Sequence, residues 1–72
     1  MAKIKFEESE VIGDSKLKET GRWMPSATVL RSGREVGRIG PLERPLFESK
    51  KQADDYVIAE VMAGRLKLPK SN

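Results

Sequence analysis

The residues GRWMPSATVLRSGREVGRIG, numbers 21–40, set the architecture expected for this chain. Residues 23–31 are rich in β-formers with apolar side chains on both parities, which predicts a strand. Gly33 can adopt a positive φ, so RSGR is typical of a tight turn. Residues 35–40 then form a second, short strand paired with the first. Pro25 has no N–H to donate, which predicts a sheet edge or a bulge at that point.

A single helix is predicted after this hairpin, over residues 50–63. Ser49 is a typical N-cap, and Gln52, three residues later, completes a capping box. Gly64 lies where a C′ glycine ends a helix. At about 100° per residue, three apolar side chains form one stripe that is expected to cover the sheet. These are Ala53, Val57 and Val61.

The remaining segments complete one small domain over residues 1–72. The alternation in residues 3–7 predicts a strand. Residues 13–21 are polar and flanked by glycines, which predicts a flexible loop, and residues 65–72 are expected to form an extended tail. The predicted fold class is therefore α+β, a three-stranded antiparallel sheet packed on one C-terminal helix in the order β-β-β-α.

A second apolar pair on the predicted helix, Ile58 and Met62, lies away from the stripe that faces the sheet. One interpretation is that the polar loop or the C-terminal RLKL segment folds over this pair. The other is that the pair forms a surface for a partner or for a second copy. Both interpretations predict low exposure of the two side chains in the functional state.

The composition argues against catalysis. The chain of 72 residues has neither Cys nor His, which excludes thiol nucleophiles, disulfides, Cys/His zinc sites and imidazole acid–base chemistry. The adjacent acids Asp54 and Asp55 point about 100° apart on a helix, unlike the facing carboxylates of an acid–base pair. The glycines of residues 33–40 lack a phosphate-loop pattern. We therefore expect no enzymatic activity, no metal and no cofactor.

Positive charge is concentrated in the middle of the chain. The net charge is +3 over the whole sequence, and residues 22–44 hold five Arg and two Glu with no Lys. The planar fork of Arg suits phosphates and guanine edges, and a two-stranded β-ribbon can enter a major groove. The alternative is that these Arg side chains are solvated and that the only Trp belongs to the core. The candidate nucleic-acid-binding residues are Arg22, Trp23, Arg31, Arg34 and Arg38.

The order R-W, ATVLR, SGREVGRIG and then F-x-S-x-x-x-A-x-x-Y over residues 22–65 resembles the plant AP2/ERF DNA-binding domain and the arm-type N-terminal domain of phage-type integrases. The resemblance implies three strands with a helix behind them and a sheet that lies in the DNA major groove. It implies packing roles for Phe47, Ser49, Ala53 and Tyr56. It implies DNA contacts for Arg22, Trp23, Arg31 and Arg38.

The sequence therefore predicts a small, non-catalytic binding module, with DNA or RNA as the favoured partner. The alternative is an accessory module that binds another protein or forms a homodimer through Ile58 and Met62 or through a strand edge. The charged N-terminus has no apolar core of a signal peptide. No apolar run approaches the roughly 18 residues of a membrane span, so we expect a soluble cytoplasmic protein without a membrane partner.

Overall fold

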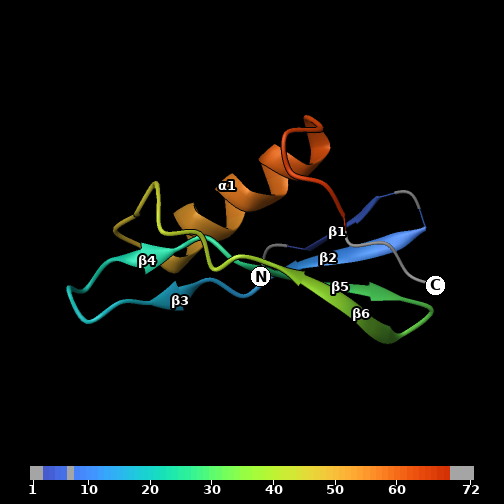
Figure 1. Ribbon diagram of the computed structural model, residues 1–72, viewed down its shortest axis with the longest axis horizontal. Coiled ribbons are helices and arrows are strands. Elements are labelled where there is room, and N and C mark those ends of the chain that lie inside the picture. The colour runs from blue at the N-terminus through green and yellow to red at the C-terminus, as the bar shows by residue number, and fades with distance from the viewer. Residues whose placement is uncertain (1–2, 7, 69–72) are drawn as a thin grey trace.

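The computed structural model describes residues 3–6 and 8–68. Four antiparallel strands form a sheet in the order β1-β2-β5-β6, two more form a small sheet, and α1 lies across one side of the larger sheet (Figure 1). The α+β class is confirmed, whereas the expected number of three strands is wrong. The elements are β1 Lys3–Phe6, β2 Ser9–Gly13, β3 Lys16–Leu17, β4 Trp23–Met24, β5 Ala27–Arg31, β6 Arg34–Ile39 and α1 Lys50–Met62.

The additional strand of the large sheet comes from the N-terminal segment, which folds back on itself. Phe6 lies opposite Ser9, so β1 and β2 form a hairpin. Glu8, in the turn, has a φ of 69°, a conformation that is uncommon for a residue other than glycine. Because the turn contains no Gly, Asn or Pro, nothing in its composition indicated a reversal.

The predicted strand 23–31 is interrupted at Pro25, and the two parts belong to different sheets. The predicted irregularity at Pro25 is confirmed, but the consequence is larger than a bulge, because β4 pairs with β3 whereas β5 pairs with β2 and β6. The expectation that residues 13–21 form only a loop is wrong, since β3 lies within them. Trp23 also bridges to Phe47 on the other side of β4.

The hairpin of β5 and β6 is formed as predicted. Its two-residue turn has a φ of 53° at Ser32 and 78° at Gly33, which are the paired positive values of a type I′ turn. The register changes between Val29 and Leu30, since Val29 lies opposite Gly37 and Leu30 lies opposite Glu35. Val36 is therefore an extra residue in β6, and the strand contains a β-bulge.

The predicted helix is confirmed, with its caps. The Ser49 side chain accepts a hydrogen bond from the backbone N–H of Gln52 at 3.2 Å. Gly64, with a φ of 79°, follows the C-cap residue Ala63. A glycine at C′ adopts this left-handed conformation without a steric penalty, which ends the helix.

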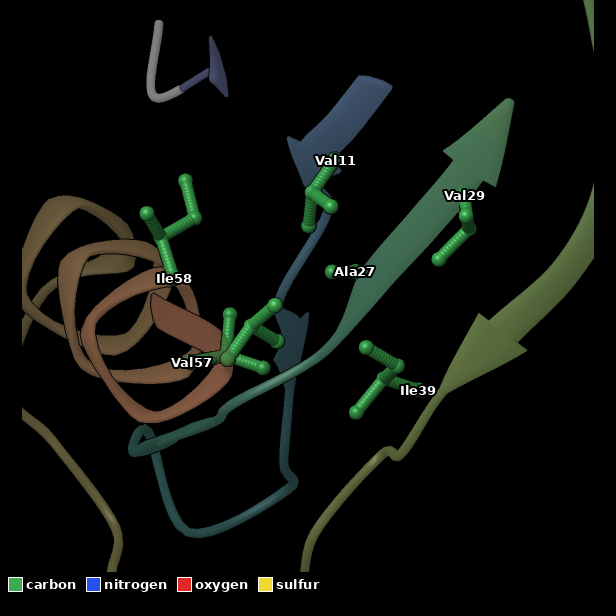
Figure 2. Packing of buried hydrophobic residues seen from close by; sticks show 7 residues of the cluster. Val11, Ala27, Val29, Ile39, Val57 and Ile58 are labelled. Carbon is green, nitrogen blue, oxygen red and sulfur yellow. The ribbon is translucent and has the colours of Figure 1, made fainter. Parts of the chain in front are cut away.

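The core lies between α1 and one face of the large sheet. Figure 2 shows how Val57 and Ile58 of α1 pack with apolar side chains of the strands. The predicted stripe is confirmed, because Ala53, Val57 and Val61 are all buried. Leu66 and Leu68 of the C-terminal segment pack against this core, and residues 69–72 of the predicted tail lie outside the described residues. The strands contribute Val11, Ala27, Val29 and Ile39.

A polar link joins the helix to the sheet beside this core. The Asp54 side chain is 3% exposed; its carboxylate accepts a hydrogen bond from the backbone N–H of Ser15 at 2.9 Å and pairs with the Lys50 ammonium at 2.6 Å. Burial alone would raise the pKa of Asp54, but the hydrogen bonds from Lys50 and Ser15 outweigh it and lower the pKa. The Cβ of Asp54 lies so close to Gly13 that a Cβ at Gly13 would stand 2.5 Å from it. The absence of a side chain at Gly13 thus permits this contact.

Shortening Val57 to alanine tests the packing of the core. Val57 has no exposed surface, so Val57→Ala should lower the free energy of unfolding by about 1–3 kcal/mol. Urea denaturation of the two proteins measures the difference. A control variant should leave the backbone preference of the helix unchanged, which excludes Ala59→Gly. Met62→Ala is suitable because Met62 is 59% exposed. It should change the free energy of unfolding by less than about 0.5 kcal/mol. Equal losses in both variants would contradict the assigned core.

Candidate nucleic-acid interface

The β3–β4 hairpin carries its basic side chains on one of its two sides. Lys16 lies opposite Met24 and Leu17 lies opposite Trp23, and the backbone N–H of Lys18 donates to the carbonyl of Arg22 at 2.7 Å. Since successive residues of a strand point to opposite sides, one side of the hairpin carries Leu17 and Trp23. The other side carries Met24 together with Lys16, Lys18 and Arg22, and we call it the basic side.

The turn of this hairpin extends away from the four-stranded sheet (Figure 1). The backbone N–H of Gly21 donates to the carbonyl of Lys18 at 2.9 Å, and Gly21 has a φ of 86°. This is the three-residue loop in which a left-handed glycine follows a tight turn. Glu19, in the turn, is the only acid between Lys16 and Met24, so residues 16–24 carry a local charge of +2.

The structure does not bring the five predicted site residues onto one surface. Arg22 and Trp23 belong to the small sheet, because the chain is interrupted at Pro25. Arg31 lies on the helix side of the large sheet, where it donates to the Ser9 hydroxyl at 3.4 Å. Arg34 lies directly opposite Arg31 and therefore on the same side.

Arg38 lies on the opposite face of the large sheet, which we call the outer face. It lies opposite Thr28, and its guanidinium contacts the Asp14 carboxylate at 2.6 Å. The Thr28 hydroxyl donates to the same carboxylate at 2.5 Å. Burial alone would raise the pKa of Asp14, but the hydrogen bonds from Thr28 and Arg38 outweigh it and lower the pKa. The hydrogen bond and charge of Asp14, in turn, raise the pKa of Arg38.

The outer face is electrically balanced rather than basic. Lys3 forms an ion pair with Glu10 at 3.0 Å, and the register places Glu35 on the same face as Arg38. Three cations therefore stand against three carboxylates around the half-buried Ile12 and Leu30. A balanced surface offers little attraction to a polyanion. The charged residues of this face are Lys3, Lys5, Glu10, Asp14, Glu35 and Arg38.

The sequence does not single out Lys16 and Lys18 as candidate contact residues, because it predicts a flexible loop over residues 13–21. The alternation in KLK, followed by Gly21, was the available signal for a short strand and its turn. The signal is weak because a two-residue strand contains only a single period of the alternation.

The predicted partner-binding pair is divided by the fold. Ile58 is 7% exposed and belongs to the core, whereas Met62 is 59% exposed. Ile58 follows Val57 at only about 100° around the helix, so one broad apolar face includes both. The expected low exposure is thus confirmed for Ile58, and the expected cover by the chain's own segments is wrong for Met62.

Within residues 3–6 and 8–68, no cluster of three acidic side chains is placed to hold a metal ion. In the same part of the chain, no helix is long and apolar enough to cross a membrane. No family model, curated protein or solved structure matches the chain.

Proposed function

We propose that this protein is a small, non-catalytic module that binds nucleic acid through the basic side of its β3–β4 hairpin. The observation that carries the proposal is the gathering of Lys16, Lys18 and Arg22 on one side of a projecting two-stranded ribbon. A ribbon of this kind has the dimensions to enter a major groove. The hairpin carries a local charge of +2 over residues 16–24, in contrast to the balanced outer face.

The chemistry of the basic side determines the kind of binding. Two ammonium groups and one guanidinium make favourable contacts with phosphate oxygens, and these contacts contain no base information. Binding should therefore tolerate changes of sequence and weaken steeply with salt. With three cations, the affinity rests on few phosphate contacts and is modest.

Only part of what the resemblance to AP2/ERF-like and integrase arm-type domains implies is kept in this proposal. Arg22 remains a proposed contact residue, and Trp23 lies beside it on the opposite side of the hairpin. The positions of Arg31 and Arg38 on different faces of the large sheet favour the small hairpin over the large sheet as the contact surface. The proposed cytoplasmic location is compatible with either kind of nucleic acid.

Neutralising the basic side tests the proposal. The variant Lys16→Gln/Lys18→Gln/Arg22→Gln should lower the slope of log affinity against log salt by roughly 2–3 units on mixed-sequence duplex DNA. Fluorescence anisotropy with labelled duplex and single-stranded DNA, over a series of salt concentrations, measures both affinity and slope.

A second variant removes the same amount of charge elsewhere. Lys5→Gln/Lys51→Gln/Lys67→Gln changes three exposed lysines outside the hairpin and should keep most of the affinity and slope. Absence of binding by the unmodified protein at low salt would overturn the proposal. Equal losses in the two variants would show general attraction to a cationic protein rather than a site.

A further inference from the structure

β6 is the longer of the two edge strands of the large sheet. The sheet ends at β1 on one side and at β6 on the other, and neither strand is paired further with a described strand. Edge strands are commonly protected by shortness, lysine or proline. β1 has four residues, two of which are lysine, whereas the six residues of β6 include neither lysine nor proline.

The alternation of backbone hydrogen bonds across the sheet shows which residues of β6 direct their N–H and C=O groups to the free edge. The backbone N–H of Asp14 donates to the carbonyl of Ser26 at 2.9 Å, so the even-numbered residues of β5 bond toward β2. The residues of β6 that lie opposite those even-numbered residues are Glu35 and Arg38. Their N–H and C=O groups are therefore directed to the free side of β6.

We infer that β6 pairs with the β6 strand of a second copy of this chain, antiparallel about a two-fold axis between Val36 and Gly37. In this register Glu35 lies opposite Arg38 of the second copy, and Arg38 lies opposite its Glu35. Both residues direct their backbone groups outward, so each of the two opposed pairs can exchange two backbone hydrogen bonds. The result is one continuous sheet of eight strands.

The bulge in β6 agrees with this pairing. A bulge normally protects an edge, because the two outward-facing residues are three positions apart rather than two. A strand with regular spacing cannot match this interval, but a second copy contains the same interval and runs in the opposite direction. The two strands are thus complementary to each other, as an isologous interface requires.

Charge fixes the register. The side chains of Glu35 and Arg38 both lie on the outer face, opposite Leu30 and Thr28, and Glu35 already contributes to the raised pKa of Arg38 in the single chain. The two-fold axis between Val36 and Gly37 places both carboxylates opposite guanidiniums that lie on the same face of the sheet. An axis at Val36 would place Arg34 opposite Arg38, which is unfavourable. Arg38 uses one nitrogen for Asp14, and a guanidinium has further N–H groups for a second carboxylate.

Analytical ultracentrifugation of the full chain over a range of concentrations tests the inference. The unmodified protein should show a monomer–dimer equilibrium. Glu35→Lys, at an exposed position, brings like charges together twice and should weaken dimerisation roughly tenfold or more. Arg34→Gln, which changes an exposed charge of the same strand outside the predicted ion pairs, should leave the equilibrium within about twofold.

A mixing experiment distinguishes this interface from any other. Arg38→Glu should dimerise poorly by itself, because it places carboxylates opposite each other. An equimolar mixture of Glu35→Lys and Arg38→Glu should form a heterodimer, since each substituted side chain then faces an opposite charge. A protein that stays monomeric at millimolar concentration would overturn the inference. So would a dimer that persists unchanged in Glu35→Lys, or a mixture that shows no heterodimer. These measurements do not involve DNA, so their outcome neither supports nor contradicts the proposed function.

Discussion

Replacing Gly13 by alanine should lower the free energy of unfolding by about 3 kcal/mol or more. A Cβ at this position would lie 2.5 Å from both Cβ and Cγ of Asp54, which is well inside van der Waals contact. The contact is with the first turns of α1, so the relief of this overlap requires the helix to move away from β2. That movement would also break the hydrogen bond from Ser15 to Asp54. Urea denaturation followed by circular dichroism measures the loss.

Two comparisons separate overlap from backbone strain. Gly33→Ala adds a Cβ in open space at a φ of 78°, so its cost of roughly 1–2 kcal/mol arises only from the left-handed backbone. Gly13→Ala should cost much less in an Asp54→Gly background, where the overlapping atoms are absent. If Gly13→Ala costs the same in both backgrounds, the close contact between helix and sheet is not its cause.

The helix and the central hairpin were predictable because their signals are local. Ser49, Gln52 and Gly64 form a complete set of helix boundaries, and each acts on backbone groups within four residues of itself. Gly33 likewise determines a turn between two strands that are neighbours in sequence. Such signals can be recognised in the sequence because the interactions they report on lie within a few residues.

The β1–β2 hairpin could not be predicted because its turn carries no local turn signal. The separation of β4 from β5 could not be predicted because it depends on contacts between distant residues. Glu8 adopts a positive φ within a turn that has no favourable turn residue, so the pairing of the strands must stabilise it. Trp23 is held by Leu17 on one side and Phe47 on the other. The division of the arginines between faces follows from this pairing and from the bulge at Val36. A basic composition over residues 22–44 therefore did not predict a basic surface.

The buried carboxylate of Asp54 should contribute far more to stability than its neighbour Asp55. Both acids pair with a lysine one turn earlier in α1, at 2.6 and 2.7 Å, but the Asp54 side chain is 3% exposed and that of Asp55 is 52% exposed. Asp54→Ala leaves the Ser15 N–H without its acceptor and removes a charged hydrogen bond, which should cost about 3 kcal/mol. Asp55→Ala should cost less than about 0.5 kcal/mol, because its ion pair is exposed to water. Similar losses in the two variants would mean that Asp54 is not buried as described.

The same carboxylate makes stability sensitive to acid, and the sign follows from its lowered pKa. Asp54 and Asp14 both have a pKa below the ordinary value of 3.8 in the folded protein, so the unfolded chain binds protons more readily as the pH falls. Their contribution is complete above the ordinary pKa and is lost as the pH falls through the folded pKa. The difference in unfolding free energy between the unmodified protein and Asp54→Asn should therefore be constant from pH 7 to about pH 5 and shrink below about pH 4. Denaturation at a series of pH values measures it, with Asp55→Asn as the matched control. A difference that grows on acidification would require a raised pKa for Asp54 and would contradict the hydrogen bonds assigned to Lys50 and Ser15.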